Sequence, residues 1–201
     1  MRKVLYAAIL WLLSLTTATA QTVALNSDGL DSAYVESIVK RSQKIVDGLN
    51  LSDAQQAEAV RNIIANRYFL LNQIHEANKD NADKRDAELY KHHFELQSAL
   101  SLYLTDEQVD AVKDGMTFGR LKRDYQATQD MIPTLSDFEK QQILIWLKEA
   151  REYAMDAADS KGKHYWFDKY RGRTNNWLSA RGYDLKKERD EWMKRLEKEK
   201  K

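Results

Sequence analysis

Residues 136–158 read SDFEKQQILIWLKEAREYAMDAA, and this stretch decides the fold because its apolar residues recur every three or four positions. Such spacing places them on one face of an α-helix, whereas a half-buried strand would alternate every second residue. Ser136 is suited to begin the helix, since its hydroxyl can accept the backbone N–H of Glu139. The expected inward-facing residues are Ile143, Leu144, Leu147, Ala150, Ala154 and Ala158. The stretch therefore predicts one long amphipathic helix.

The rest of the chain follows the same helical period. One proline and seven glycines among 201 residues leave few helix breakers. Further helices are predicted from about Tyr34 to Gly48, from Ser52, from about Asp83, around 109–116, from the break at 160–162 to about Ala180, and after Asp184. The segment from Thr117 to Pro133 loses the period, and we expect a loop there, punctuated by Gly115 and Gly119. These features predict an all-α protein, a single-domain irregular bundle of about seven or eight helices.

Three short segments share one pattern: Leu-Ser-Asp-Ala-Gln at 51–55, Leu-Thr-Asp-Glu-Gln at 104–108 and Leu-Ser-Asp-Phe-Glu at 135–139. In each, a hydroxyl can accept a backbone N–H three residues on, while the Gln or Glu there bonds back, which makes a capping box. We interpret all three as helix starts. Their unequal spacing argues against a repeat array. A second interpretation is a similarity to small periplasmic stress chaperones, which carry Leu-Thr-x-x-Gln motifs on curved helical shells.

The first 20 residues have the pattern of an export signal. Arg2 and Lys3 precede an apolar run at 4–15, and Ala18-Thr19-Ala20 supplies the small residues that a signal peptidase accepts. Cleavage is predicted before Gln21, which leaves residues 21–201 as one helical domain with a frayed, basic C-terminal end. An uncleaved anchor is the alternative. Because no later segment reaches the roughly 18 apolar residues of a membrane span, the mature chain is predicted to be soluble, and periplasmic or secreted.

Cysteine content and charge narrow the classes of partner. The chain has no cysteine, which excludes a disulfide framework. Residues 21–159 carry 16 basic and 24 acidic side chains, and residues 160–201 carry 14 basic and 7 acidic ones, so the two parts differ in sign. We expect the basic end to meet the acidic part of the same fold rather than an external anion. Nucleic acid is not expected as a partner, because dedicated binders are usually strongly basic.

The segment 163–184, KHYWFDKYRGRTNNWLSARGYD, crowds aromatic rings, amides and guanidinium groups together. Aromatic and basic side chains recur on one helical face, and rings of this kind stack on the C–H face of a sugar while polar groups take its hydroxyls. The candidate ligand-binding residues are His164, Trp166, Tyr170, Arg173, Asn175, Asn176 and Trp177. The alternative is an aromatic stripe packed into the core, with Arg173 reaching out to solvent.

A second candidate cluster combines a histidine with carboxylates. Its members are Arg67, Tyr68, Asn72, His75, Glu152 and Asp156. Tyr68, Asn72 and His75 share one helical face, and a histidine near neutral pH can act as acid or base. The carboxylates Glu149, Glu152, Asp156 and Asp159 also follow one another at helical spacing. They could supply two carboxylates for glycoside cleavage or a set of calcium ligands. The alternative is an ordinary solvated face or the counterpart of the basic end.

Histidine spacing does not predict a metal site. His92 and His93 are adjacent and point about 100° apart on a helix, so they cannot chelate one ion from one face. His75-Glu76 is followed by Lys79 where the zinc-protease helix motif requires a second histidine. No metal and no cofactor are therefore expected.

Several stretches together resemble a known family. They are Asn66-Arg67-Tyr68 with 71–75 (LNQIH), 113–117 (KDGMT), 149–156 (EAREYAMD) and, most specifically, 163–184. Over nearly all of the mature chain, the sequence is similar to a secreted Bacteroidetes family known as domain of unknown function family 3826. The resemblance implies a signal-bearing helical protein associated with glycan-utilisation systems, and it implies no catalytic residues.

Three functions follow from these residues. The first is an exported protein that binds a glycan or another periplasmic component through the face from Trp166 to Trp177. The second is a carbohydrate-active enzyme in which His75 or His164 and a carboxylate, Glu152 or Asp156, act as acid and base. The third is a chaperone-like or scaffolding protein whose helices cover apolar surface on a partner protein.

Overall fold

The computed structural model describes residues 22–199, and this part of the chain contains nine helices and no strand. The helices are α1 (Ser32–Asp47), α2 (Ala54–Ala77), α3 (Ala82–His92), α4 (Glu95–Leu100), α5 (Asp106–Met116), α6 (Arg120–Met131), α7 (Asp137–Met155), α8 (Ser160–Ala180) and α9 (Leu185–Glu199). The predicted all-α class is confirmed. The predicted signal peptide lies outside the described residues.

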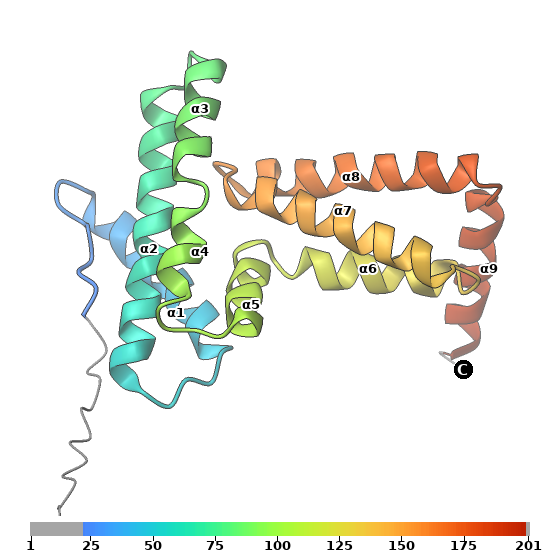
Figure 1. The fold of residues 1–201 in the computed structure, drawn as a ribbon, viewed down its shortest axis with the longest axis horizontal. Coiled ribbons are helices and arrows are strands. Elements are labelled where there is room, and N and C mark those ends of the chain that lie inside the picture. Colours follow the sequence, from blue (N-terminus) through green and yellow to red (C-terminus); the bar gives the residue numbers. More distant parts are fainter. Residues whose placement is uncertain (1–21, 200–201) are drawn as a thin grey trace, which may run out of the picture.

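The helices form two arms (Figure 1). The N-terminal arm, α1 to α5, is gathered around the long helix α2, with α3 and α4 along one side of it. In the C-terminal arm, α6, α7 and α8 run away from α2, and α9 crosses their far end. The closest pairing in the molecule is the antiparallel hairpin of α7 and α8, which is joined by a short turn at residues 156–159.

Each arm has its own hydrophobic core, and α7 belongs to both. In the N-terminal arm, Ile64, Leu100 and Val112 are completely shielded from solvent. In the C-terminal arm, Phe167 and Leu178 are equally buried. Full burial of such a side chain contributes roughly 1.5–3 kcal/mol each. At the end of α7, Met155 packs into the first core while its neighbour Ala154 packs into the second, so the two arms form one domain.

Two of the three predicted capping boxes are confirmed, and one is wrong. Thr105 with Gln108 caps α5, and Ser136 with Glu139 caps α7, each with both reciprocal hydrogen bonds present. The box expected at Ser52 is absent. Instead, the Asp53 carboxylate accepts the N–H groups of Gln55 and Gln56 and begins α2 one residue later than predicted. An Asp directly after a Ser competes for the same role, because both accept backbone N–H groups.

The loop expected from Thr117 to Pro133 is wrong, because α6 occupies most of that segment. The apolar spacing that indicates a helix is missing from α6, because only two of its side chains are buried. These are Arg120 and Leu121, and Arg120 is charged. Only 117–119 separates α5 from α6. Phe118 (φ 61°) and Gly119 (φ 62°) both adopt the left-handed region there, which turns the chain sharply between the two helices.

The helix expected from about Asp83 is interrupted. It forms α3, which buries no residue, and α4, which buries Leu96 and Leu100; the break falls at His93 and Phe94. The interruption turns the His93 side chain toward α7 (see below). Among the described helices, none has the length and apolar character needed to cross a membrane.

Candidate binding site between the two arms

An open cavity of about 740 Å³ lies where α2 and α3 meet the ends of α7 and α8 that adjoin their connecting turn. We call it the aromatic cavity, because its lining includes the rings of Tyr90, Phe94, Tyr153 and Trp166. Its volume falls in the range typical of small-molecule sites. Both arms contribute to its walls, so the cavity exists only because the arms meet at this angle.

Three of the four rings are exposed to solvent, and the least exposed of these, Tyr153, is 47% exposed. Tyr90 is 73% exposed and Phe94 63% exposed, and they meet edge to face with centroids 6.4 Å apart. Tyr153 and Trp166 instead stack on each other with centroids 4.5 Å apart and form the opposite wall. A single exposed ring is ordinary on a protein surface, but adjacent exposed rings that line a cavity together are a candidate contact surface. Both sides of the cavity therefore present aromatic rings to its interior.

A charged network forms the base of the aromatic cavity. The carboxylate of Asp156 accepts a hydrogen bond from Arg67 at 2.5 Å and from Nδ1 of His93 at 2.6 Å. Since the carboxylate accepts, Nδ1 of His93 carries the proton, and its other ring nitrogen, Nε2, lies 3.8 Å from Glu152. The His93 imidazole therefore lies between two carboxylates and lines the cavity, where it can exchange hydrogen bonds with a bound molecule.

Glu152 is held by a second cation from the N-terminal arm. Lys113 of α5 donates to both carboxylate oxygens of Glu152 at 3.0 Å, and it also donates to Gln97 at 2.8 Å. His75 of α2 donates from Nε2 to the backbone carbonyl of Asp156 at 2.8 Å. Helices α2 and α5 and the break between α3 and α4 therefore converge on two carboxylates of the other arm, which fixes the positions of the titratable groups.

Burial makes this network sensitive to loss of any member. Arg67 is 5% exposed, and its Nε has no hydrogen-bond partner among the described residues. Its Nη1 donates to the carbonyl of His92 at 2.8 Å. A buried guanidinium in this position depends on its carboxylate, because removing one partner of a buried ion pair leaves an uncompensated charge.

Four residues of the second predicted cluster are brought together, and two are not. Arg67, His75, Glu152 and Asp156 converge at the aromatic cavity as described. Tyr68 and Asn72 line a different cavity on the other side of the α7–α8 turn. The turn separates them physically, since its residues Ala157, Ala158 and Asp159 line both cavities. Helical spacing places the side chains on one face of α2, but it does not show that another segment divides that face.

The aromatic stripe predicted on α8 packs mainly against α7. Tyr170 is 6% exposed. Trp177 meets Trp146 edge to face at 5.2 Å, and the Arg173 guanidinium lies 4.7 Å from the Trp146 ring while pairing with Glu149 at 3.5 Å. This arrangement agrees with the alternative of a packed stripe with Arg173 at its rim. Of the stripe, Trp166 alone lines the aromatic cavity.

The remaining predicted residues of α8 point elsewhere. His164 accepts a hydrogen bond from Arg120 at 2.7 Å and stacks on Phe118, on the side of α8 that faces α6. Asn175 lines a separate hollow between α6, α7 and α9, and Asn176 is exposed. They lie about half a turn or a quarter turn from the aromatic stripe, so the first predicted cluster does not form one site.

Sequence reasoning missed Tyr90, Phe94, His93 and Lys113. His93 was weighed only together with His92 as a chelating pair, and its position at a helix break was not foreseen. Lys113 stands in a stretch that carries the family resemblance, yet its partner Glu152 is 39 residues away. No pattern in one sequence reports such a pairing. Within residues 22–199, no three His, Asp or Glu side chains are grouped so as to hold a metal ion.

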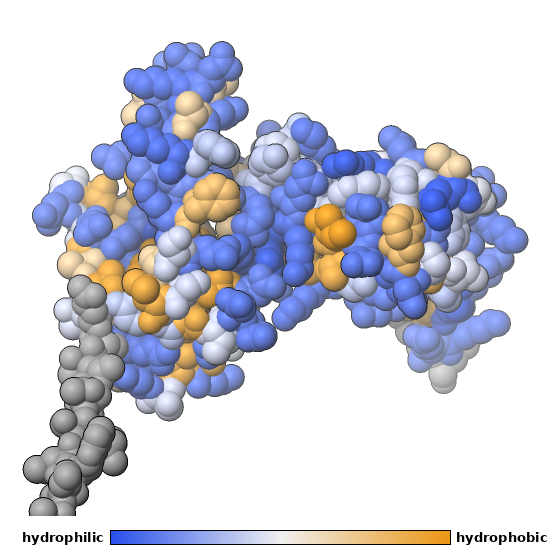
Figure 2. Space-filling model, in the orientation of Figure 1, coloured by the Kyte–Doolittle hydropathy of each residue, from blue (hydrophilic) through white to orange (hydrophobic). Residues whose placement is uncertain are grey.

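Apolar side chains do not form one broad surface on the face shown in Figure 2. Several apolar residues lie close together on the lower part of the N-terminal arm, and on the C-terminal arm they lie as separate spots among hydrophilic residues. A protein that covers apolar surface on a partner requires a contiguous apolar face.

Comparison with known proteins agrees with the family resemblance. The profile of the family described as "Protein of unknown function (DUF3826)" matches residues 35–85 and 77–198, which include every helix that lines the aromatic cavity. No curated protein matches the chain. The match covers most of the chain, and this protein therefore belongs to the DUF3826 family.

Proposed function

We propose that this protein is exported and binds a glycan in the aromatic cavity. The observation that carries the proposal is the pair of exposed rings, Tyr90 and Phe94, beside partly buried polar groups in a cavity of about 740 Å³. Sugars present C–H faces that stack on aromatic rings and hydroxyls that bond to charged side chains. The ligand contacts assigned here therefore differ from those predicted from sequence, with Trp166 as the shared member.

The polar side of the cavity suits hydroxyl recognition. Glu152 and Asp156 are acceptors, and His75 and His93 are imidazoles that can donate or accept. All four line the cavity, and all four are held by hydrogen bonds to other residues. Side chains held in this way lose little conformational entropy when a ligand arrives, which favours binding.

Export is part of the same proposal. The basic start, the apolar run and the small residues at 18–20 support a cleaved signal peptide at 1–20, followed by a single domain at 21–201. A periplasmic or secreted location would put the protein where glycans are taken up. The resemblance to a secreted Bacteroidetes family supports a place beside glycan-utilisation systems, with a glycan or a periplasmic protein as partner.

A carbohydrate-active enzyme is the second candidate, and one contact favours it. His93 is oriented by Asp156 at 2.6 Å, and its Nε2 faces Glu152 at 3.8 Å. An imidazole oriented by a carboxylate and lining a cavity is one of the arrangements that acid–base catalysis uses. His93 takes the role that the sequence suggested for His75 or His164.

A glycan array followed by product analysis separates the two functions. The full chain is compared with Phe94→Ala, which removes an exposed ring, and with Phe138→Ala, which removes an exposed ring at the far end of α7. Binding predicts that Phe94→Ala loses the array signal and Phe138→Ala keeps it, with the glycan recovered intact. Cleaved glycan that disappears in His93→Gln would instead establish the enzyme. Equal signals from the two phenylalanine variants would exclude the aromatic cavity as the binding site.

A further inference from the structure

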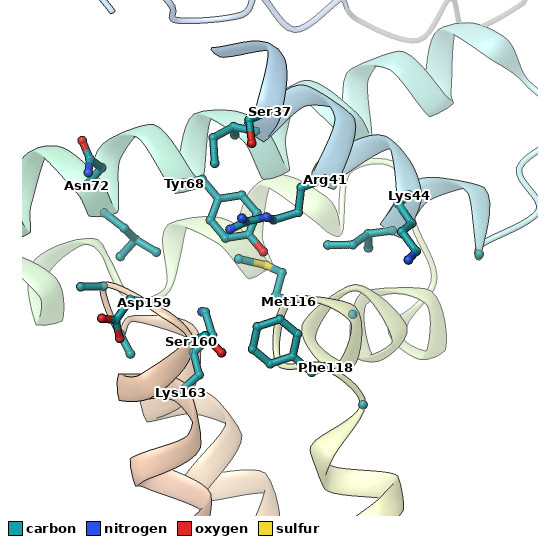
Figure 3. A pocket seen from close by; sticks show the side chains of 18 of the residues that line it. Ser37, Arg41, Lys44, Tyr68, Asn72, Met116, Phe118, Asp159, Ser160 and Lys163 are labelled. Carbon is teal, nitrogen blue, oxygen red and sulfur yellow. The ribbon is translucent and has the colours of Figure 1, made fainter. Parts of the chain in front are cut away.

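A second cavity of about 890 Å³ lies on the other side of the α7–α8 turn (Figure 3). It is enclosed by α1, α2, α5 and the first turn of α8. We call it the basic cavity, because its lining contains the cations Arg41, Lys44 and Lys163 and a single carboxylate, Asp159. That carboxylate is already engaged, since it accepts the backbone N–H of Gly162 at 2.7 Å and caps α8. The cavity therefore has an excess of positive charge.

An unused hydrogen-bond donor lies inside the basic cavity. Tyr68 is 9% exposed, yet its hydroxyl bonds to none of the residues that the structure describes. Figure 3 shows the ring between α1 and α2, with the hydroxyl directed toward Met116. Burial raises the pKa of Tyr68 to about 12, so the hydroxyl keeps its proton and acts as a donor. The hydroxyl is not among the fully shielded polar atoms that lack a partner in the described residues, so it is open to the cavity and can reach a ligand there.

Arg41 is also without a carboxylate. Its guanidinium lies 5.6 Å from the centre of the Tyr68 ring, in a cation–π contact, and none of its N–H groups is bonded to a described residue. Arginine forms bidentate pairs with carboxylate, sulfate and phosphate groups when they are present. The Arg41 guanidinium and the Tyr68 hydroxyl are thus neighbouring donors, and neither is bonded to a described residue.

Lys163 supplies a third donor from α8. Its ammonium group donates to the carbonyls of Ala154 and Met155 at 3.1 and 3.3 Å, which uses two of its three N–H groups. Burial, opposed by the nearby Asp156 and assisted by Arg41 and Arg67, lowers the pKa of Lys163 to about 8. A bound anion would stabilise the charged form of this lysine.

We propose that the basic cavity binds a small organic anion. Its charged group, a carboxylate, sulfate or phosphate, lies among Arg41, Lys163 and the Tyr68 hydroxyl. Its apolar body packs against the remaining lining, which includes Ile38, Met116 and the half-exposed Phe118. Phe118 holds a left-handed backbone conformation (φ 61°), which costs energy for a residue with a side chain and is often retained at ligand sites.

Two dyes that share an aromatic body test this proposal. The probe is 1-anilinonaphthalene-8-sulfonate, and its neutral counterpart is N-phenyl-1-naphthylamine, which lacks the sulfonate. The full chain is titrated with each dye and compared with Arg41→Gln, Tyr68→Phe and Lys40→Gln. Lys40 matches Arg41 in charge and helix but does not line the cavity. Tyr68→Phe removes only the unbonded hydroxyl, so it keeps the fold and isolates the donor.

The expected result is saturable binding of the sulfonate dye, weakened about tenfold by Arg41→Gln and several-fold by Tyr68→Phe, and unchanged by Lys40→Gln. Inorganic sulfate or phosphate should displace the sulfonate dye, and the more effective of the two indicates the natural charged group. Equal affinity for both dyes, or equal loss in Lys40→Gln and Arg41→Gln, overturns the proposal. Phe94→Ala should leave dye binding unchanged, so this test fails or succeeds independently of glycan binding.

Discussion

Nδ1 of His93 lies 2.6 Å from Oδ2 of Asp156, although the two residues are 63 positions apart in the chain. The contact joins the break between α3 and α4 to the end of α7, and so it links the two arms. Arg67 reaches the other oxygen of the same carboxylate. Asp156 is therefore the residue on which both the fold of the junction and the polar side of the aromatic cavity depend.

Replacing Asp156 with alanine should destabilise the protein by about 3–5 kcal/mol, because the buried guanidinium of Arg67 loses its carboxylate. Urea unfolding followed by circular dichroism measures the change. The double variant Arg67→Met, Asp156→Ala should be more stable than Asp156→Ala alone, since no buried charge then remains unpaired. If the double variant loses as much stability as Arg67→Met and Asp156→Ala lose together, the ion pair does not couple the two residues.

Glu139 should contribute stability that disappears in acid. The hydrogen bonds from Arg181 and from the Ser136 backbone lower the pKa of Glu139 from 4.5 to about 2. A carboxylate with a lowered pKa stabilises the folded state fully above pH 4.5, and that contribution is lost as the pH falls from 4.5 toward 2. Because Arg181 is partly exposed, we expect about 2 kcal/mol.

The variant Glu139→Gln isolates this effect. Glutamine keeps the size of the side chain and can still take part in the capping box of α7. Unfolding free energies measured at pH 7 and pH 3 should differ less in the variant than in the wild type. An identical pH dependence in the two proteins would contradict the assignment.

Phe167→Ala should cost about 3–5 kcal/mol, because the ring is completely buried in the C-terminal core and its loss leaves a cavity. The Arg120 guanidinium, 5.3 Å from the ring centre, loses its cation–π contact as well. Phe138→Ala, at a 61% exposed position, is the matched control and should cost under about 1 kcal/mol in the same thermal or urea measurement. Equal losses of unfolding free energy in the two variants would contradict the placement of Phe167 in the C-terminal core.

Two glycine-to-alanine substitutions should act in opposite directions. Gly119 has φ 62°, where an added Cβ is strained, so Gly119→Ala should destabilise by about 1 kcal/mol. Gly172 lies within α8 with nothing within 4 Å of an added Cβ, so Gly172→Ala should stabilise by about 0.5–1 kcal/mol. Melting temperatures of the two variants should move apart, and a shift in the same direction would refute the argument.

The sequence was sufficient for the helical class and for those elements with strong local signals. The α7 helix was predicted at its correct start, because the capping box at Ser136 and a regular apolar face agree. In contrast, α6 was missed because a charged residue, Arg120, is one of its buried positions. The Arg120 side chain is stabilised there by Asp124, Asp168 and His164, of which the last two come from α8 and cannot be read from the local sequence.

The candidate site was predictable only in part, for a related reason. Helix geometry correctly grouped Arg67 with His75, and it correctly spaced Glu152 and Asp156. It could not show that the α7–α8 turn would separate His75 from Tyr68 and Asn72, because that depends on how two distant helices pack. Nor could it identify Tyr90 and Phe94 as candidate ligand contacts. Their exposure depends on how the two arms pack, because other parts of the fold could have covered these rings.

Calorimetric titration of the double variant Tyr90→Ala, Phe94→Ala with the glycan selected on the array tests the central claim most directly. Tyr90 lies in α3 and Phe94 lies just after it, and both rings are exposed. Their removal should therefore leave the melting temperature nearly unchanged. The account predicts an affinity at least about tenfold weaker than that of the wild type. An unchanged affinity in a fully folded double variant would contradict it.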